Sequence, residues 1–455
     1  MDEKKEILDE IFELLNTRSF VKLRAVLEEM NPADIAAVLD TLDEKEMPLV
    51  YRILPKDLAS DVFAYMDSDK KELLIRSFSD FELKEVIDDL FLDDTVDMIE
   101  EMPANVVARV LQAADPAVRK QINELLKYPE DSAGGIMTVE YVSLKKDLTV
   151  AEAFRKIRRE GIDKETVYTC YVTENRKLIG TVSVKELLIA DDDRIVSDIM
   201  ETNVISIDAY EDKEIVAQTF SKYDVLALPV VDKDGRLVGI VTVDDAMDVM
   251  EDEATEDIEK MAAMTPNDRP YLKTGVFSIW LKRIPWLLLL MVSATFTGSI
   301  ISSFESALTA FPALVAFIPM LMDTGGNAGG QSSVTIIRGM AVGEIRMRDV
   351  LRVVWKEARV AVLCGLALTA AGFLKILLVD NALMHSGVTY PEMAVVCITL
   401  AVTVFCAKLV GCTLPILAKR LGLDPAVMAS PFITTIIDAV SLVVYFTVAT
   451  HILSI

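Results

Sequence analysis

Hydrophobic and polar positions divide this 455-residue chain into four stretches with different periodicities. Over residues 1–130, apolar residues recur at three- and four-residue intervals, which predicts amphipathic helices. Over residues 131–250, short runs rich in valine and isoleucine alternate with helical patterns, which predicts strands and helices. An acidic helical pattern covers residues 244–272, and long apolar runs dominate residues 273–455. We therefore expect a multidomain protein with an all-α domain, an α/β domain, a connecting helix and an α-helical transmembrane domain.

A weak repeat runs through the N-terminal helical region. Its units begin about 24 residues apart, at Pro32, Pro55, Ser79 and Pro103. Such spacing predicts short helix pairs that stack into a superhelix over residues 1–130. Most acidic residues of this region are expected on a solvated face. The dense acidic run from Asp88 to Asp97 is different, because like charges so close together favour a bound cation.

A stronger repeat fills residues 131–250, in copies of about 136–197 and 198–250. Each copy has the pattern of a strand, a helix, two strands and a helix. The first copy closes with KLIGTVSVKELL (Lys177–Leu188) and the second with RLVGIVTVDDAM (Arg236–Met247). This arrangement resembles a tandem pair of cystathionine-β-synthase (CBS) domains, which are regulatory modules that often bind adenine nucleotides and dimerise.

The resemblance to CBS domains also implies a nucleotide site. Their ribose-contacting pattern, Ser/Thr-x-x-Asp, is matched by Thr242 with Asp245. Ser183 with Glu186 differs from the pattern by one methylene group. The resemblance therefore implies that these four residues could contact ATP or another adenine nucleotide.

An acidic helix is predicted at the joint between the polar and the apolar halves of the chain. Asp245, Asp248, Asp252 and Glu256 follow one another at three- and four-residue steps, so they share one face of this helix. Like charges at these spacings destabilise a helix unless counter-ions are present. We interpret the segment as a cation-responsive element, and the alternative is a solubilising linker.

Five apolar segments are each long enough to cross about 30 Å of hydrocarbon. They cover residues 284–304, 307–337, 360–379, 393–418 and 427–450. Lysine and arginine precede the first segment and occur between the second and third and between the fourth and fifth, whereas the other two loops contain none. By the positive-inside rule, we expect a cell-membrane protein whose N-terminal domains are cytoplasmic and whose C-terminus lies outside.

One carboxylate, Asp438, lies near the middle of the last apolar segment. An acid in hydrocarbon costs roughly 2.5–3.5 kcal/mol on insertion scales, so it usually faces a bundle interior or an aqueous path. Lys375 and Lys408 are interpreted as snorkelling residues near span ends rather than as its partners. The polar residues expected to line a common path are Asp323, Asn327, Gln331, Ser430, Thr434, Thr435, Asp438 and Ser441.

Composition narrows the class of ligand. The net charge of −25 comes from the residues before Leu272, and the rest of the chain is weakly basic. An acidic domain repels nucleic acid and anionic lipid but attracts cations. The five cysteines form no CxxC pair and the chain has two histidines, which argues against a zinc or copper site. Any bound metal is expected to be a hard ion with oxygen ligands.

Two motifs in the apolar half resemble the MgtE family of magnesium channels and transporters. They are GGNAGGQ (Gly325–Gln331) and DPAVMASPFITTIIDAVSLVVYF (Asp424–Phe446). The order of the predicted domains is similar to that of the family over essentially the whole chain. The resemblance implies a homodimer with one pore between the subunits, in which Asp438 of both chains holds a hydrated Mg²⁺ and Thr434 lies beside the ion. It also implies that the acidic helix is a plug.

The same resemblance implies a set of cytosolic carboxylates that sense Mg²⁺ and close the plug. They are Asp93, Asp97, Glu214, Asp224, Asp245, Asp248, Glu253, Glu256 and Asp257. Loss of the ion would restore repulsion among these acids and separate the domains, which describes a two-state switch.

The predicted function is therefore a Mg²⁺-selective channel or transporter that imports Mg²⁺ and is closed by cytosolic Mg²⁺, and not an enzyme. A carrier coupled to H⁺ or Na⁺ is one alternative, and a CBS-bearing membrane sensor without transport is another. A third is an intramembrane aspartyl protease, because Asp323-Thr324-Gly325 matches a protease tripeptide and Asp438 could supply the second acid.

Overall fold

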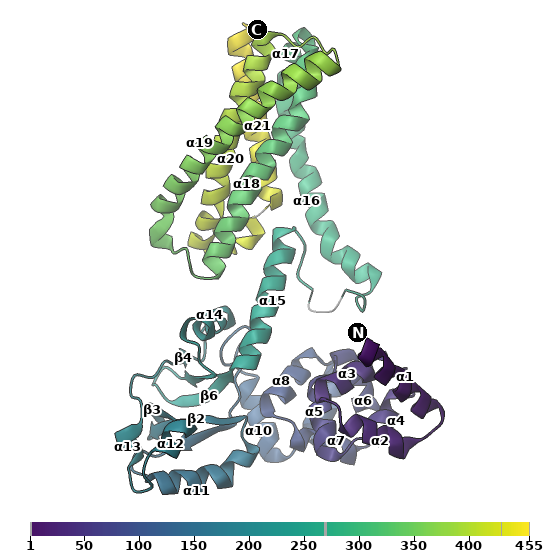
Figure 1. Cartoon of the computed structure of the whole chain (residues 1–455), viewed down its shortest axis with the longest axis vertical. Helices are drawn as coiled ribbons and strands as arrows, with labels where there is room; N and C mark the ends of the chain where they lie inside the picture. Colours follow the sequence, from purple (N-terminus) through teal and green to yellow (C-terminus); the bar gives the residue numbers. More distant parts are fainter. Residues whose placement is uncertain (1, 268–270, 429, 455) are drawn as a thin grey trace. The chain divides into compact units, whose positions relative to one another are not determined.

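The computed structural model describes residues 2–267, 271–428 and 430–454, with the backbone alone at residues 2–6, 163, 428 and 430 (Figure 1). The chain forms two compact units, Met1–Val249 and Met250–Ile455. The first unit contains a helical half and an α/β half, and the second contains the long apolar helices. The predicted fold class is confirmed.

Ten helices form the N-terminal half of the first unit. They are α1 (Asp2–Asn16), α2 (Phe20–Glu28), α3 (Pro32–Thr41), α4 (Met47–Tyr51), α5 (Lys56–Ala64), α6 (Ser68–Ser77), α7 (Asp80–Asp89), α8 (Leu92–Glu101), α9 (Ala104–Ala113) and α10 (Pro116–Leu125). The four repeat positions lie at the starts of α3, α5, α7 and α9. Each sequence repeat therefore corresponds to a pair of consecutive helices.

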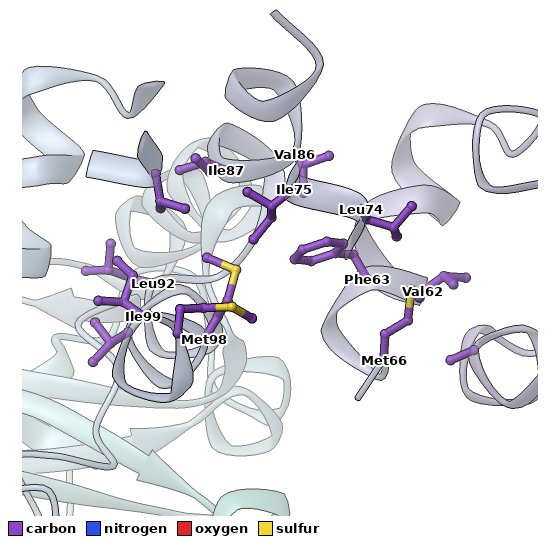
Figure 2. Close-up of a cluster of buried hydrophobic side chains, with 14 of the residues drawn as sticks. Val62, Phe63, Met66, Leu74, Ile75, Val86, Ile87, Leu92, Met98 and Ile99 are labelled. Atoms are coloured by element: carbon purple, nitrogen blue, oxygen red, sulfur yellow. The ribbon is translucent and has the colours of Figure 1, made fainter. Parts of the chain in front are cut away.

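Local chemistry explains these helix starts. Pro32 is the first residue of α3, and Pro55 and Pro103 directly precede α5 and α9; at these positions the missing N–H of proline would have no intrahelical partner. At the third start, Ser79 and Glu82 form a reciprocal capping box at the N-terminus of α7. The buried faces of α5 to α8 contribute to one hydrophobic core (Figure 2), whose labelled residues include Phe63, Ile75 and Met98.

Two three-stranded sheets form the other half of the first unit. Its elements are β1 (Tyr141–Leu144), α11 (Val150–Glu160), the 3₁₀ turn η1 (Gly161–Asp163), β2 (Thr166–Glu174), β3 (Lys177–Ser183), α12 (Val184–Ile189), α13 (Val196–Ile199), β4 (Ile207–Asp208), α14 (Lys213–Tyr223), β5 (Ala227–Val231), β6 (Leu237–Thr242) and α15 (Val243–Met261). The strand orders are β1-β2-β3 and β4-β5-β6. In each sheet the first two strands are parallel and the last two antiparallel, so the two copies share one topology.

The second unit is built from helices. They are α16 (Val276–Ser303), α17 (Glu305–Ala310), the 3₁₀ segment η2 (Pro312–Phe317), α18 (Ile318–Ala341), the turn η3 (Met347–Asp349), α19 (Val350–Lys375), the π-helical segment η4 (Ile376–Leu383), α20 (Tyr390–Arg420), the turn η5 (Ala426–Met428) and α21 (Ser430–Leu453). Helix α18 packs against both α20 and α21, α19 packs against α20, and α16 packs against α21. Their shared core includes Val404, Ile433, Ile437 and Tyr445.

The helix bounds differ from the predicted segments in several places, and α19 begins at Val350, before the third predicted segment of residues 360–379. The segment predicted over residues 307–337 is divided into α17, η2 and α18, because Pro312 and Pro319 begin new helical segments. The acidic helix predicted over residues 244–272 ends at Met261.

Among the described residues, four helical segments are long and apolar enough to cross a membrane. They are Val276–Ser303, Met347–Leu383, Tyr390–Arg420 and Pro431–Leu453. The central helix α18 has the length to span but is less apolar, because it contains Asp323, Asn327, Gln331 and several glycines. Three of these glycines lie on the side of α18 that packs against α20 and α21.

Candidate metal centre and transport path

Glycines bring α18 into close contact with α21. A Cβ added to Gly326 would lie 3.0 Å from Cγ2 of Thr434, and one added to Gly325 would lie 3.0 Å from Oγ of Ser441. Both distances are tighter than most Cβ contacts, so glycine at these positions lets the two helices approach closely. Thr434 therefore lies directly against the glycine-rich turn of α18.

The opposite face of α18 remains open. Asp323, Asn327 and Gln331 are all exposed on the single chain, and they follow one another at four-residue steps. Asp323 interacts electrostatically with Asp438 of α21. In the part of the chain that the structure describes, Oδ1 of Asp438 is buried and has no hydrogen-bond partner. Two carboxylates from two helices thus lie near one another at the edge of an open polar face.

Three other predicted path residues have different surroundings. Thr435 lies against α16, where its hydroxyl donates to the Pro431 carbonyl at 3.0 Å and lies 3.4 Å from Oγ of Ser293. Ser441 is fully buried inside the bundle, and its hydroxyl has no partner among the described residues. The side chain of Ser430 lies outside the described residues. The face of α21 that meets α18 therefore carries fewer polar residues than the predicted path.

A second group of acids lies in the first unit, at the junction of the helical and α/β halves. We call Asp93, Asp97, Glu140, Glu165 and Asp245 the acid cluster. One carboxylate oxygen from each of Asp93, Glu140 and Glu165 lies within 4.8 Å of the others. Asp245 acts electrostatically on Asp93 and Glu165, and it also acts on Asp97, which joins the cluster through Asp245. Asp93 and Asp97 lie on α8, and Asp245 lies in the first turn of α15.

Strand pairing explains how two of these acids meet. Glu140 immediately precedes β1 and Glu165 immediately precedes β2, and these strands are parallel neighbours that pair Tyr141 with Thr166. The backbone N–H of Glu165 donates to the Glu140 carbonyl at 3.0 Å. The backbone N–H of Leu92 donates to Oε2 of Glu140 at 3.1 Å, so the start of α8 lies at the same strand end. The sequence predictions did not include Glu140 or Glu165.

Burial and repulsion by nearby acids raise the pKa values of four members of the acid cluster, Asp93, Asp97, Glu165 and Asp245. Burial, followed by the charge of Asp245, raises the pKa of Asp97 to about 7 and that of Glu165 to about 8. Burial likewise raises the pKa of Asp245 to about 6, although Thr242 donates a 2.5 Å hydrogen bond to its carboxylate. The pKa of Asp93 is raised well above its ordinary range for the same two reasons.

Two buried carboxylate oxygens of the acid cluster point to a cation. Oδ1 of Asp93 and Oε2 of Glu165 have no hydrogen-bond partner among the described residues. Buried acceptors without a partner are costly, and a divalent cation would both coordinate these oxygens and remove the repulsion. Clustered carboxylate oxygens without histidine or cysteine suit a hard ion such as Mg²⁺.

The other predicted sensor acids lie on α14 and α15. Glu214 is in the first turn of α14, and Asp224 ends this helix in a left-handed conformation with φ of 51°. Asp248, Glu253 and Asp257 lie along α15. Among the described residues, none of these five belongs to the group within 4.8 Å around Asp93.

Glu256, the remaining predicted sensor acid, is part of an ion-pair network. Lys260 contacts Glu256 and also lies 2.6 Å from Oδ2 of Asp424, in the loop before α21. A lysine ammonium therefore already neutralises part of this acidic segment.

The predicted nucleotide residues cap helices in both CBS copies. Ser183 and Glu186 form a capping box at the start of α12, with Oγ of Ser183 2.9 Å from the Glu186 carboxylate. Thr242 directly precedes α15 and donates to Asp245 in the corresponding position. The two pairs are structurally equivalent, and Asp245 belongs to both the predicted nucleotide site and the acid cluster.

Three family models match the chain. The model of the divalent cation transporter domain MgtE matches residues 318–448, and the model of the MgtE intracellular N domain matches residues 30–131. The CBS domain model matches residues 133–193 and 196–252.

Curated and solved proteins give the same picture. The chain is 38% identical to the magnesium transporter MgtE of Thermus thermophilus, over 99% of this chain and 98% of the relative. It is 32% identical to the magnesium transporter MgtE of Bacillus subtilis, over 98% of this chain and 97% of the relative. The solved cytosolic domain of the Mg²⁺ channel MgtE in complex with ATP is 36% identical, with a TM-score of 0.51, and covers 53% of this chain and 99% of that chain. The solved soluble part of a magnesium transporter is 31% identical, with a TM-score of 0.52, over 55% and 99%.

Proposed function

The chain belongs to the MgtE family of divalent cation transporters, and from this premise we propose that it carries Mg²⁺ across a membrane along the open face of α18. This membership confirms the family resemblance of the sequence motifs. The members that the chain matches over their full length are transporters and not enzymes, so the protease reading of Asp323 and Asp438 has no support.

The observation that supports the path most directly is the buried, unpartnered oxygen of Asp438 beside the Asp323 carboxylate. Mg²⁺ gives up water reluctantly, so a transport site with few carboxylates binds a largely hydrated ion and lets it leave again. Asn327 and Gln331 supply amide groups along the same face, and these can contact the water shell of the ion. Asp438 is therefore proposed as the central ion ligand, with Thr434 beside it.

The open face of α18 also supports a homodimer. Polar side chains at membrane depth are costly when they face lipid. Asp323, Asn327 and Gln331 are uncovered in a single chain, and a second copy placed against this face would enclose them in a shared aqueous path. The pore would then lie between the subunits, with one Asp438 from each.

Regulation is proposed to come from the acid cluster. Mg²⁺ bound there would hold α8, the first CBS copy and the first turn of α15 together, and its loss would restore repulsion among the five acids. Glu214, Asp224, Asp248, Glu253, Glu256 and Asp257 are proposed as further sensor residues, which act when the cytosolic parts of two subunits approach. High cytosolic Mg²⁺ would close the path.

Nucleotide binding is proposed at the CBS pair. A solved relative holds ATP in its cytosolic domain, and Thr242 with Asp245 has the pattern of a ribose contact. The basic loops between the apolar helices support a cytoplasmic location for the first unit, with the C-terminus on the outer face of the cell membrane.

Flux into proteoliposomes tests the proposed path. Asp438→Ala is expected to abolish Mg²⁺ uptake while the purified protein keeps its fold, because the ion loses its central ligand. Glu305→Gln is a matched control, since Glu305 is an exposed acid of the same unit at the start of α17. Unchanged uptake by Asp438→Ala would reject the path. If Mg²⁺ uptake required a Na⁺ or H⁺ gradient, the protein would be a coupled carrier and not a channel.

A further inference from the structure

A buried polar junction joins three helices of the membrane unit away from Asp438. Lys408 of α20 is 5% exposed and Ser332 of α18 is 2% exposed. The hydroxyl of Ser332 lies 2.7 Å from Oε2 of Glu357 on α19, and Nζ of Lys408 lies 3.3 Å from the same hydroxyl. We call these three residues the polar junction.

Lys408 lies too deep to reach water along its own helix. It precedes Arg420, at the end of α20, by twelve residues, which corresponds to roughly 18 Å at 1.5 Å per residue. The prediction that Lys408 snorkels is therefore wrong for this residue. Lys375, in contrast, lies at the end of α19 and pairs with Asp380 at 2.9 Å. A lysine at the depth of Lys408 must be matched by a partner inside the protein, and such residues usually have a function.

The hydrogen-bonding capacity of serine fits this position. A hydroxyl donates one hydrogen bond and accepts up to two, so Ser332 can donate to the Glu357 carboxylate and accept from the Lys408 ammonium at the same time. Both bonds are charge-assisted, which strengthens them. One side chain of α18 thereby links opposite charges on the two helices beside it.

Apolar packing isolates the polar junction from water on one side. One turn further along the three helices, Ile336, Cys412 and Val353 belong to a single buried cluster. Glu357 and Lys408 both act electrostatically on Cys412, which places all three side chains close together. In such surroundings electrostatic interactions are stronger than in water.

The polar junction lies beside the tightest contact between α18 and α20. A Cβ on Gly411 would collide with the carbonyl of Gly329, so the two backbones touch at this point. Ser332 follows Gly329 by three residues and Lys408 precedes Gly411 by three residues. The glycine contact fixes the distance between the helices, but glycine has no side chain that could prevent α18 from rotating about its axis.

The rotation of α18 determines where its open face points. Gln331 directly precedes Ser332, and Asn327 lies one turn earlier on the same face as Gln331. We propose that Lys408, Ser332 and Glu357 are positioning residues that fix the rotation of α18 and thereby the selectivity of the path for Mg²⁺ over monovalent cations. This inference rests on the proposed function, because it takes the open face of α18 as the path.

Ion-current recording on the purified full-length protein in planar bilayers tests the junction. Lys408→Met keeps the length and removes the charge, and Ser332→Ala removes the link with little change of volume. Each is expected to lower the permeability ratio of Mg²⁺ to Na⁺ about 3- to 10-fold, the range that interhelical hydrogen bonds of membrane helices reach. Lys408→Arg is expected to keep the ratio near wild type.

A charge exchange separates positioning from folding. Lys408→Glu alone places two acids beside Ser332 and should have the largest effect. Combined with Glu357→Lys, it restores one donor and one acceptor around the hydroxyl, so the permeability ratio should return toward wild type. The control is Lys375→Met, which removes the ammonium of the other intramembrane ion pair at a span end and should leave the ratio unchanged.

Four outcomes overturn the inference. Wild-type permeability ratios in both Lys408→Met and Ser332→Ala would reject positioning, and Ser332→Ala alone decides the matter if Lys408→Met does not fold. An equal change in Lys375→Met would show that any lost ion pair has this effect. Wild-type Mg²⁺ currents that are insensitive to Asp438→Ala would reject the proposed path itself, and with it the role of the junction. Currents that depend on Asp438 but not on Ser332 would reject the junction only.

Discussion

Carboxylates gather in both units of the molecule, but in different numbers and surroundings. The acid cluster of the first unit combines acids from four segments, and burial with repulsion raises their pKa values. The proposed path of the second unit has two acids among the described residues of each chain, Asp323 and Asp438, on two helices that meet at glycines. Many acids suit a Mg²⁺ sensor, because their repulsion in the absence of the ion opposes the closed state. Few acids suit a transport path, because an ion bound by many carboxylates would leave too slowly.

Removing charge from the acid cluster should have the largest effect on regulation. Asp93→Asn combined with Asp245→Asn removes two ligand carboxylates and much of the repulsion, so the Mg²⁺ concentration that closes the path should rise on the order of 100-fold. Protease protection of the full-length protein, titrated with Mg²⁺, measures this midpoint. Asp147→Asn is a control, because Asp147 is an exposed acid of the same unit. An unchanged midpoint in the double variant would remove the acid cluster from the sensor.

Removing the second acid of the path should have a smaller effect. Asp323→Asn keeps the size and hydrogen-bonding groups of the side chain but removes one charge beside Asp438, so the Mg²⁺ current should fall about tenfold. The current of Asp438→Asn should fall further, since Asp438 is the proposed central ligand. Single-channel recordings of both variants test this order. A current in Asp323→Asn equal to that of wild type would show that one acid per chain is sufficient.

The ion pairs at the end of α15 should contribute less than either group of acids. Lys260→Met removes the contacts with Glu256 and Asp424, both of which are partly exposed. Exposed ion pairs contribute up to about 1 kcal/mol, so the closing Mg²⁺ concentration should change by about threefold. The same protease titration measures this change, with Lys260→Arg as the conservative control. If Lys260→Met changed the closing Mg²⁺ concentration as much as the Asp93 and Asp245 double variant, the main Mg²⁺ sensor would have to lie at this end of α15.

Local patterns predicted the helices well and the tertiary contacts less completely. Proline and serine at regular spacing predicted the helix-pair starts, because these residues act within one turn. Glu140 and Glu165 were missed because they come together only through strand pairing. A signal was available: the pattern of strand, helix and strand predicts parallel neighbours, so acids that directly precede both strands should meet.

In the membrane unit, too, the sequence did not predict which residues meet across helices. Thr435 and Ser441 were both predicted to line the path, but helical spacing cannot say which neighbouring helix each of them meets. In the structure, Thr435 lies against α16 and Ser441 inside the bundle. Lys408 was assigned to a span end because its partners, Ser332 and Glu357, lie far away in the sequence. Asp323, Asn327 and Gln331 were grouped correctly on one exposed face of α18, because their spacing alone defines it.

The smallest predicted effect concerns the stability of the first unit without metal. Asp97, Glu165 and Asp245 have pKa values raised to about 7, 8 and 6, so between their ordinary pKa values and these values the folded state binds more protons than the unfolded chain. Stability must then fall as the pH rises through this window. The melting temperature of residues 1–249 without Mg²⁺ should be about 2–4 °C lower at pH 8 than at pH 6.

Magnesium should remove this dependence, because the ion favours the ionised carboxylates and proton loss no longer costs stability. Thermal unfolding followed by circular dichroism, with and without saturating Mg²⁺, measures both effects. Glu165→Gln should flatten the metal-free curve in part, whereas Asp147→Asn should not. A melting temperature without Mg²⁺ that rises between pH 6 and pH 8 would show that repulsion among the ionised acids of the acid cluster does not destabilise the first unit. The proposed difference between the two units, a sensor whose acids repel one another without Mg²⁺ and a path with few acids, would then have no support.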